Sequence, residues 1–104
     1  MKTNPQDTDT ADPLLDHRRD IDRIDRTIVA LLAERMRIGV AAGQIKLALS
    51  HPVRNELREA DVLSRVREAA ARPLSPESAE RIFHAIIEET AACQVAALAG
   101  ASDE

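Results

Sequence analysis

Apolar residues recur at steps of three and four over residues 14–49, which is the spacing of one face of an α-helix. Residues 12–13 are Asp-Pro, a pair typical of an N-cap and the first helical position. Pro52 ends the run, because a proline disfavours helical backbone at the preceding residue. The pattern therefore predicts a first helix that is roughly 50 Å long at about 1.5 Å per residue.

A second, shorter helix is predicted to begin near residues 53–55 and to end near Ala71. Leu57, Val62 and Val66 are spaced to face inward from it. The following Arg-Pro-Leu segment, residues 72–74, ends the helical pattern.

A third helix is predicted over residues 76–98, with Ser75 as its N-cap and a proline at its first position. No run alternates cleanly between apolar and polar residues, so no strand is predicted. Residues 1–11 are polar and typical of a disordered tail, and residues 99–104 are expected to fray. We therefore expect an all-α chain with three helices in one domain, residues 12–98.

The composition makes this a thin domain. Hydrophobic residues make up 44% of 104 residues, but there is no Trp or Tyr, and Phe83 is the single Phe. A small aliphatic core gains stability from a partner chain. A first helix of about 50 Å also exceeds the size of a compact domain of this length. We therefore expect two copies that wrap their long helices together in an intertwined homodimer.

Charge and residue types exclude several classes of function. The net charge is −4 without a basic block, which argues against a nucleic-acid partner. We see no apolar run of about 20 residues that would span a membrane, and no secretory segment at the N-terminus. Cys93 is the single cysteine, so a reducing, cytoplasmic setting is expected. His17, His51 and His84 have no ligand partners at metal-binding spacing, so we expect no metal.

Arg35 interrupts the apolar face of the first helix, at a position where the pattern asks for Leu or Ile. A guanidinium stays charged, so burying it unpaired is costly. Its partner could be a protein carboxylate, such as Asp25 or Glu34, or a bound anion. Lys46 lies eleven residues later on the same face, roughly 16 Å along the axis. The two cations could grip the ends of one small anionic molecule.

Arg18 lies seventeen residues before Arg35, roughly 25 Å along the helix, so it can approach Arg35 only from the other copy of an antiparallel dimer. The later helices contribute Arg54 and Arg58 with Glu59 beside them, and Thr90 and Gln94.

Together, these cations, the carboxylate and the amide suit a dianionic ligand with a further polar oxygen. They offer no nucleophile paired with a base. On a chain with 31% charged residues, however, most such groups solvate a helix face.

Three segments resemble the all-helical chorismate mutases of the AroQ class. They are LLDHRRDIDRIDRTIVALLAERMRIGVAAGQIK, SHPVRNELREADVL and RIFHAIIEETAACQ, which together extend over about residues 14–98. The resemblance implies an intertwined dimer with two equivalent sites, each borrowing an arginine from the opposite chain. The implied reaction is the Claisen rearrangement of chorismate to prephenate, which supplies phenylalanine and tyrosine synthesis and needs no cofactor.

The resemblance also implies a role for each polar residue. The substrate carboxylates would be bound by Arg35, Arg58 and Arg18 of the other chain. Lys46 and Gln94 would donate hydrogen bonds to the ether oxygen, and Glu59 would accept one from the ring hydroxyl. Thr90 would lie near a carboxylate, and Asn55, at the start of the second helix, would lie near the ring hydroxyl.

Asn55 departs from the Asp of the bacterial pattern, which leaves affinity or substrate choice open if the side chain makes the contact. Gln44 replaces a common Lys, with little effect expected. Three alternatives remain: a mutase for 4-amino-4-deoxychorismate, an isochorismate-pyruvate lyase, and a non-catalytic helical dimerisation or regulatory module. Arg58 followed by Glu59 favours the ordinary mutase, and from the length after the third helix we expect a monofunctional enzyme.

Overall fold

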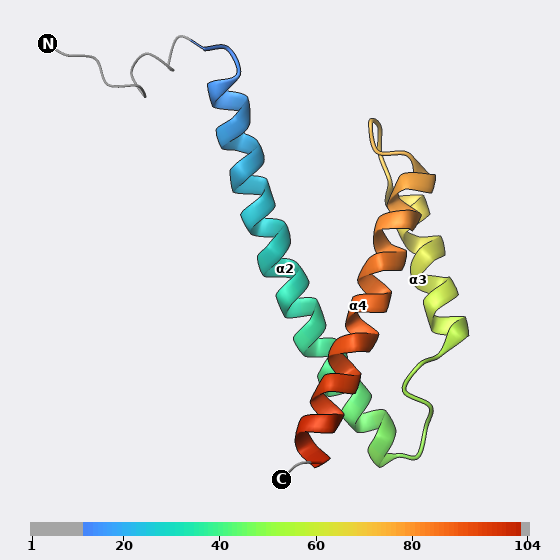
Figure 1. Cartoon of the computed structure of the whole chain (residues 1–104). Helices are drawn as coiled ribbons and strands as arrows, with labels where there is room; N and C mark the ends of the chain where they lie inside the picture. The colour runs from blue at the N-terminus through green and yellow to red at the C-terminus, as the bar shows by residue number, and fades with distance from the viewer. Residues whose placement is uncertain (1–11, 103–104) are drawn as a thin grey trace, which may run out of the picture. The chain divides into compact units, whose positions relative to one another are not determined.

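The computed structural model describes residues 12–102, and this part of the chain contains three helices and no strand (Figure 1). Helix α2 is Leu15–Ala48, α3 is Glu56–Ala69 and α4 is Pro76–Ser102. For residues 12–102, the prediction of an all-α fold with three helices is confirmed. The tail predicted for residues 1–11 lies outside the described residues.

Each helix begins where the sequence places a capping side chain. The capping oxygen accepts a backbone N–H from the first turn, which satisfies a donor that has no partner within the helix. The distances are 2.8 Å from Leu14 N to Asp12 Oδ1, 3.0 Å from Arg58 N to Asn55 Oδ1, and 3.0 Å from Ser78 N to Ser75 Oγ. Local chemistry therefore fixes the three starting points.

Two details of the helices differ from the sequence pattern. Helix α4 continues beyond the predicted end near Leu98 to Ser102, because the segment after Leu98 contains no proline and is rich in alanine. Leu57 was predicted to face inward, which is wrong, because its residue surface is 84% exposed in the first turn of α3. Val62 and Val66, which follow on the same helix, are half-buried.

Helix α4 corrects the expectation that no segment of the chain is long and apolar enough to span a membrane. By length and composition alone, Pro76–Gly100 could cross a membrane, with a mean hydropathy of 1.3 in its most apolar window. Glu88 and Glu89 interrupt this stretch, so no unbroken apolar run is visible in the sequence. Helices that pack inside helical assemblies have the same composition, and α4 packs along α3.

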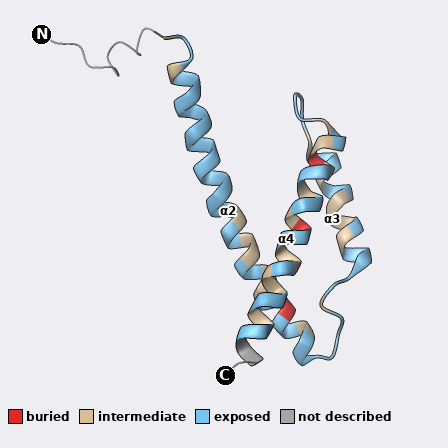
Figure 2. Ribbon diagram, in the orientation of Figure 1, coloured by how far each residue is buried: buried red, intermediate tan, exposed pale blue. Residues whose placement is uncertain are grey.

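The chain divides into two units, Met1–Ala33 and Glu34–Glu104. In the first unit, the apolar face of α2 is open to solvent (Figure 2). Ile21, Ile24 and Ile28 are 56%, 46% and 47% exposed. In a single chain, the apolar face of α2 in the first unit is therefore exposed, although its sequence pattern is typical of a buried face.

The second unit contains the buried residues of the described chain. Helices α3 and α4 lie side by side (Figure 1), and Ala79 and Ile87 of α4 are 3% and 9% exposed. On α2, Gly43 is buried and Met36 Sδ lies 3.6 Å from Cys93 Sγ of α4. The second half of α2 is thus held against α4 in the same unit that packs α3.

Candidate functional site

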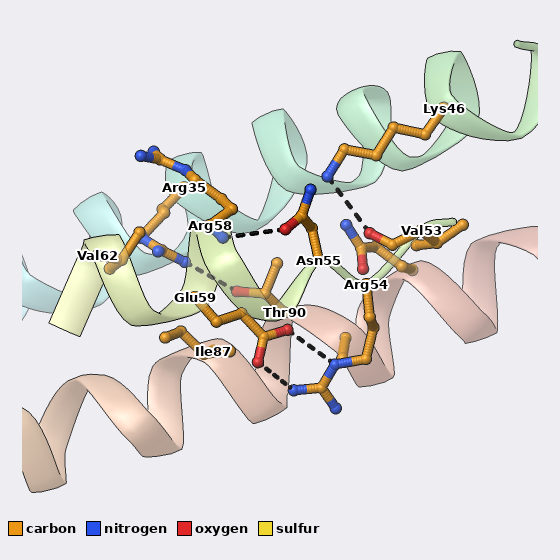
Figure 3. Close-up of a pocket in the computed structure, with 12 residues that line it drawn as sticks. Arg35, Lys46, Val53, Arg54, Asn55, Arg58, Glu59, Val62, Ile87 and Thr90 are labelled. Carbon is orange, nitrogen blue, oxygen red and sulfur yellow. Dashed lines mark hydrogen bonds and ion pairs between the residues drawn. The ribbon is translucent and has the colours of Figure 1, made fainter. Parts of the chain in front are cut away.

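A polar pocket of about 120 Å³ lies within the second unit (Figure 3). Its volume has room for a small molecule, since one water needs only about 10–15 Å³ on this measure. Residues from α2, α3, α4 and the loop before α3 line it. They are Arg35, Lys46, Val53, Arg54, Asn55, Arg58, Glu59, Val62, Ile87, Thr90, Ala91 and Gln94.

Arg35 is half-buried, and its partner is a hydroxyl instead of a carboxylate. Its Nη1 donates to Thr90 Oγ1 at 3.0 Å, and Thr90 Oγ1 donates to the Ile86 carbonyl at 2.8 Å. Neither Asp25 nor Glu34 forms an ion pair with it within residues 12–102. The hydrogen bond to Thr90 aims the guanidinium and leaves its charge available to an anion in the pocket.

Lys46 lies in the last turn of α2, where the chain turns towards α3. Its Nζ donates to the Val53 carbonyl at 3.3 Å, as Figure 3 shows, and its carbonyl accepts from His51 N at 2.8 Å. Ser50 adopts a positive φ of 60° at this turn. Lys46 therefore contacts the middle of the loop through both its side chain and its backbone, and two of its three ammonium N–H groups remain for a ligand.

Gln94 is positioned by two glycines of α2. Its Nε2 donates to the Gly39 carbonyl at 2.8 Å, which orients the amide and leaves its second N–H for a ligand. A Cβ added at Gly43 would lie 3.2 Å from Gln94 Nε2, and one at Gly39 would lie 2.6 Å from Thr90 Cγ2. No role for these glycines was predicted from the sequence, although their i, i+4 spacing places them on one face of α2.

Arg58 and Glu59 line the pocket but are not paired with each other. Arg58 Nη1 donates to Asp61 Oδ2 at 3.1 Å. Glu59 is held by Arg54, with Nε to Oε2 at 2.9 Å and Nη2 to Oε1 at 3.0 Å (Figure 3). The loop before α3 thus brings Arg54, and not the adjacent Arg58, to the Glu59 carboxylate.

Arg54 also reaches α4. Its Nη2 donates to Glu88 Oε2 at 2.9 Å and its Nη1 donates to Glu88 Oε1 at 3.3 Å. Hydrogen bonds and charge attraction from Arg54 hold the pKa of the Glu88 carboxyl below its ordinary value. Hydrogen bonds to Glu59 and Glu88 raise the pKa of the guanidinium. The sequence did not predict the ion pair with Glu88, because Glu88 is 34 residues from Arg54.

The structure brings together most of the site residues predicted from the sequence. Arg18 is the exception: it is exposed on α2 in the first unit and is not among the residues that line the pocket. Within the described residues, no three metal-binding side chains cluster. The predicted residues that line the pocket are Arg35, Lys46, Asn55, Arg58, Glu59, Thr90 and Gln94.

The pocket's chemistry is that of an anion site with neutral donors. Four cations and one carboxylate line it, together with two amides and a hydroxyl. The model of one protein family, chorismate mutase type II, matches residues 17–95, which include all of these groups. The chain belongs to the chorismate mutase type II family.

Relatives of this chorismate mutase type II chain are bifunctional proteins. It is 39% identical over 87 residues to the bifunctional chorismate mutase/prephenate dehydratase of Escherichia coli K12, a match that includes 83% of this chain. The proteins of the same name from Enterobacter agglomerans and Neisseria gonorrhoeae are 34% identical over 87 residues (83% of this chain) and 36% identical over 81 residues (78%). The matched segment is 22% of each relative, so this chain spans about a fifth of their length.

Proposed function

We propose that this chain is a chorismate mutase that converts chorismate to prephenate by a Claisen rearrangement. The observation that supports it most is the meeting of Arg35, Lys46 and Gln94 in one pocket from two helices. Family membership and the names of the relatives support the same reaction. The reaction breaks a carbon–oxygen bond as a carbon–carbon bond forms within one molecule, so it needs neither a nucleophile nor a cofactor.

Arginines bind the two substrate carboxylates in this proposal. Arg35 is already aimed by Thr90, and a planar guanidinium fits a carboxylate in bidentate geometry. Arg58 exchanges the exposed Asp61 carboxylate for that of the substrate. Clamping both carboxylates holds the enolpyruvyl arm folded over the ring. This conformer is a minor one in water, so binding it orients the reacting atoms and lowers the barrier.

Lys46 and Gln94 stabilise the transition state. Negative charge grows on the ether oxygen as its bond to the ring breaks. The two donors are held in advance by the Val53 and Gly39 carbonyls, so little reorganisation is needed when the charge develops. Glu59 accepts a hydrogen bond from the ring hydroxyl, and Asn55 stays close to that end of the pocket as the cap of α3.

A second copy of the chain completes the site. In one chain, the apolar face of α2 is uncovered at Ile21, Ile24, Ile28 and Leu31, each at least 46% exposed. Burying such a face is a major source of stability for a long helix. We propose an intertwined homodimer in which these faces are covered and Arg18 of one chain reaches the pocket of the other.

Substitution of the two donors tests the mechanism. Lys46→Ala and Gln94→Ala are each expected to lower kcat by roughly 100- to 1,000-fold, the usual cost of one transition-state donor. Conversion of chorismate to prephenate is followed by NMR, and circular dichroism controls for folding. Full activity in either folded variant would contradict the assigned mechanism. An inactive wild-type protein would favour the non-catalytic module.

Mixing two inactive variants tests the shared site. Arg18→Ala and Arg35→Ala each damage both sites of their own homodimer. In a mixed dimer one site has both arginines, so an equal mixture should recover about a quarter of wild-type activity after random exchange. Sedimentation and mass labelling establish that exchange has occurred. No recovery despite exchange would refute the cross-chain role of Arg18.

A further inference from the structure

Arg54 has no role in the function proposed above, yet it makes the most extensive polar contacts in the pocket. Its guanidinium is shared between Glu59 of α3 and Glu88 of α4, with two hydrogen bonds to each carboxylate. Four of its five N–H groups are used in this way. The side chain is therefore fixed by both helices while it lines the pocket.

The contact determines what Glu59 can offer to a ligand. Each Glu59 oxygen accepts one N–H of Arg54, so the carboxylate plane is fixed and each oxygen keeps a further acceptor site. The positive charge of Arg54 lies within hydrogen-bonding distance of the negative charge of Glu59. A ligand thus meets an oriented acceptor whose negative charge is partly compensated by a guanidinium that Glu88 also shares.

Such an acceptor favours a neutral donor over a cation. A ligand hydroxyl can donate to the remaining acceptor site without adding charge. An ammonium group at the same place would lie close to the guanidinium of Arg54, which is hydrogen-bonded to Glu59. Three further cations, Arg35, Lys46 and Arg58, also line the pocket. Like charges at such distances repel, most strongly where water is partly excluded.

We propose that Arg54 is a positioning residue that acts through Glu59 and makes the site select a substrate with a ring hydroxyl over one with a ring ammonium. This inference rests on the proposed function and names the substrate class of the same site. It addresses the choice between chorismate and 4-amino-4-deoxychorismate, whose amine is protonated at neutral pH.

The competing explanation is that Arg54 only ties α3 to α4. Arg67 provides a matched control, because its Nη1 donates to Glu80 Oε1 of α4 at 2.9 Å. The Arg67 and Arg54 side chains are 41% and 45% exposed, and Arg67 does not line the pocket. A purely structural role predicts that equivalent changes at the two arginines have equivalent effects.

The experiment measures kcat and KM of the full chain for chorismate and for 4-amino-4-deoxychorismate. Arg54→Gln should lower kcat/KM for chorismate by roughly tenfold to a hundredfold, the effect of losing a charge-assisted hydrogen bond. It should lower the value for the amino substrate less, so that the preference for chorismate narrows by about tenfold. Arg67→Gln should change neither value.

Arg54→Lys separates charge from geometry. A lysine keeps the positive charge beside Glu59 but cannot make two parallel hydrogen bonds to it. The variant should therefore keep the preference for chorismate while its kcat/KM stays below that of wild type. Circular dichroism of all variants shows whether they fold alike.

The possible outcomes are distinct. Equal losses for both substrates in Arg54→Gln, or losses matched by Arg67→Gln, would overturn the positioning role and leave the proposed function intact. A wild-type preference for the amino substrate would overturn the inference directly. A wild-type protein that converts neither substrate would refute the proposed function, and this inference with it.

Discussion

Gly39→Ala is a direct test of how closely α2 approaches α4 at the pocket. The new Cβ would lie 2.6 Å from Thr90 Cγ2, well inside van der Waals contact. Alanine in a helix interior gains about 0.5–1 kcal/mol over glycine, whereas overpacking costs about 1–3 kcal/mol. We therefore expect the variant to be less stable than wild type by up to about 2 kcal/mol.

Thr90 has little freedom to move away from the new methyl group. Its hydroxyl accepts from Arg35 and donates to the Ile86 carbonyl, so rotation of the side chain would break both hydrogen bonds. Thr90→Ser removes the Cγ2 methyl group and keeps the hydroxyl. The double variant Gly39→Ala/Thr90→Ser should therefore recover stability, with a favourable coupling of about 1–3 kcal/mol.

Urea unfolding followed by circular dichroism, at one fixed protein concentration, gives the four free energies of unfolding that this cycle needs. Gly100→Ala is the control, because a Cβ at Gly100 meets nothing within 4 Å and should be neutral or stabilising. If Gly39→Ala were as stable as Gly100→Ala, or if Thr90→Ser gave no coupling, close contact between Gly39 and Thr90 would not limit stability.

Three further predictions concern the turns and ion pairs around the pocket. Ser50→Gly should raise the free energy of unfolding by about 1 kcal/mol, because glycine adopts the positive φ of 60° without strain. Urea unfolding measures this change, with Ser50→Ala as the comparison variant. Asn55→Ala should cost about 1 kcal/mol through loss of the α3 cap, whereas Asn55→Asp should keep the cap; equal losses would contradict this. Because Arg54 lowers the folded-state pKa of Glu88, the pair stabilises above the ordinary carboxyl pKa, and this stability is lost as pH falls through the lowered value. Glu88→Gln should therefore be less stable than wild type at pH 7, and the difference should vanish in strong acid; a difference that persists there would refute the linkage.

The sequence determined the helices, because their signals are local. Caps at Asp12, Asn55 and Ser75, and apolar positions at helical spacing, depend on residues within a few positions of one another. The resemblance to a known family extended this to seven pocket residues, of which six lie on the three helices and Asn55 caps α3. Leu57 shows the limit of the pattern, since periodicity alone does not say which apolar residues find a neighbour.

Only the tertiary structure decided which polar groups meet. Arg35 pairs with Thr90, Gln94 with the carbonyl of Gly39, and Arg54 with Glu88, across separations of 55, 55 and 34 residues. Neither periodicity nor charge spacing specifies such pairs, because each depends on the distance between helix backbones. At Gly39 the absence of a side chain sets that distance. The close approach of α2 and α4, and not the residue types alone, therefore orients the hydrogen-bond donors of the pocket.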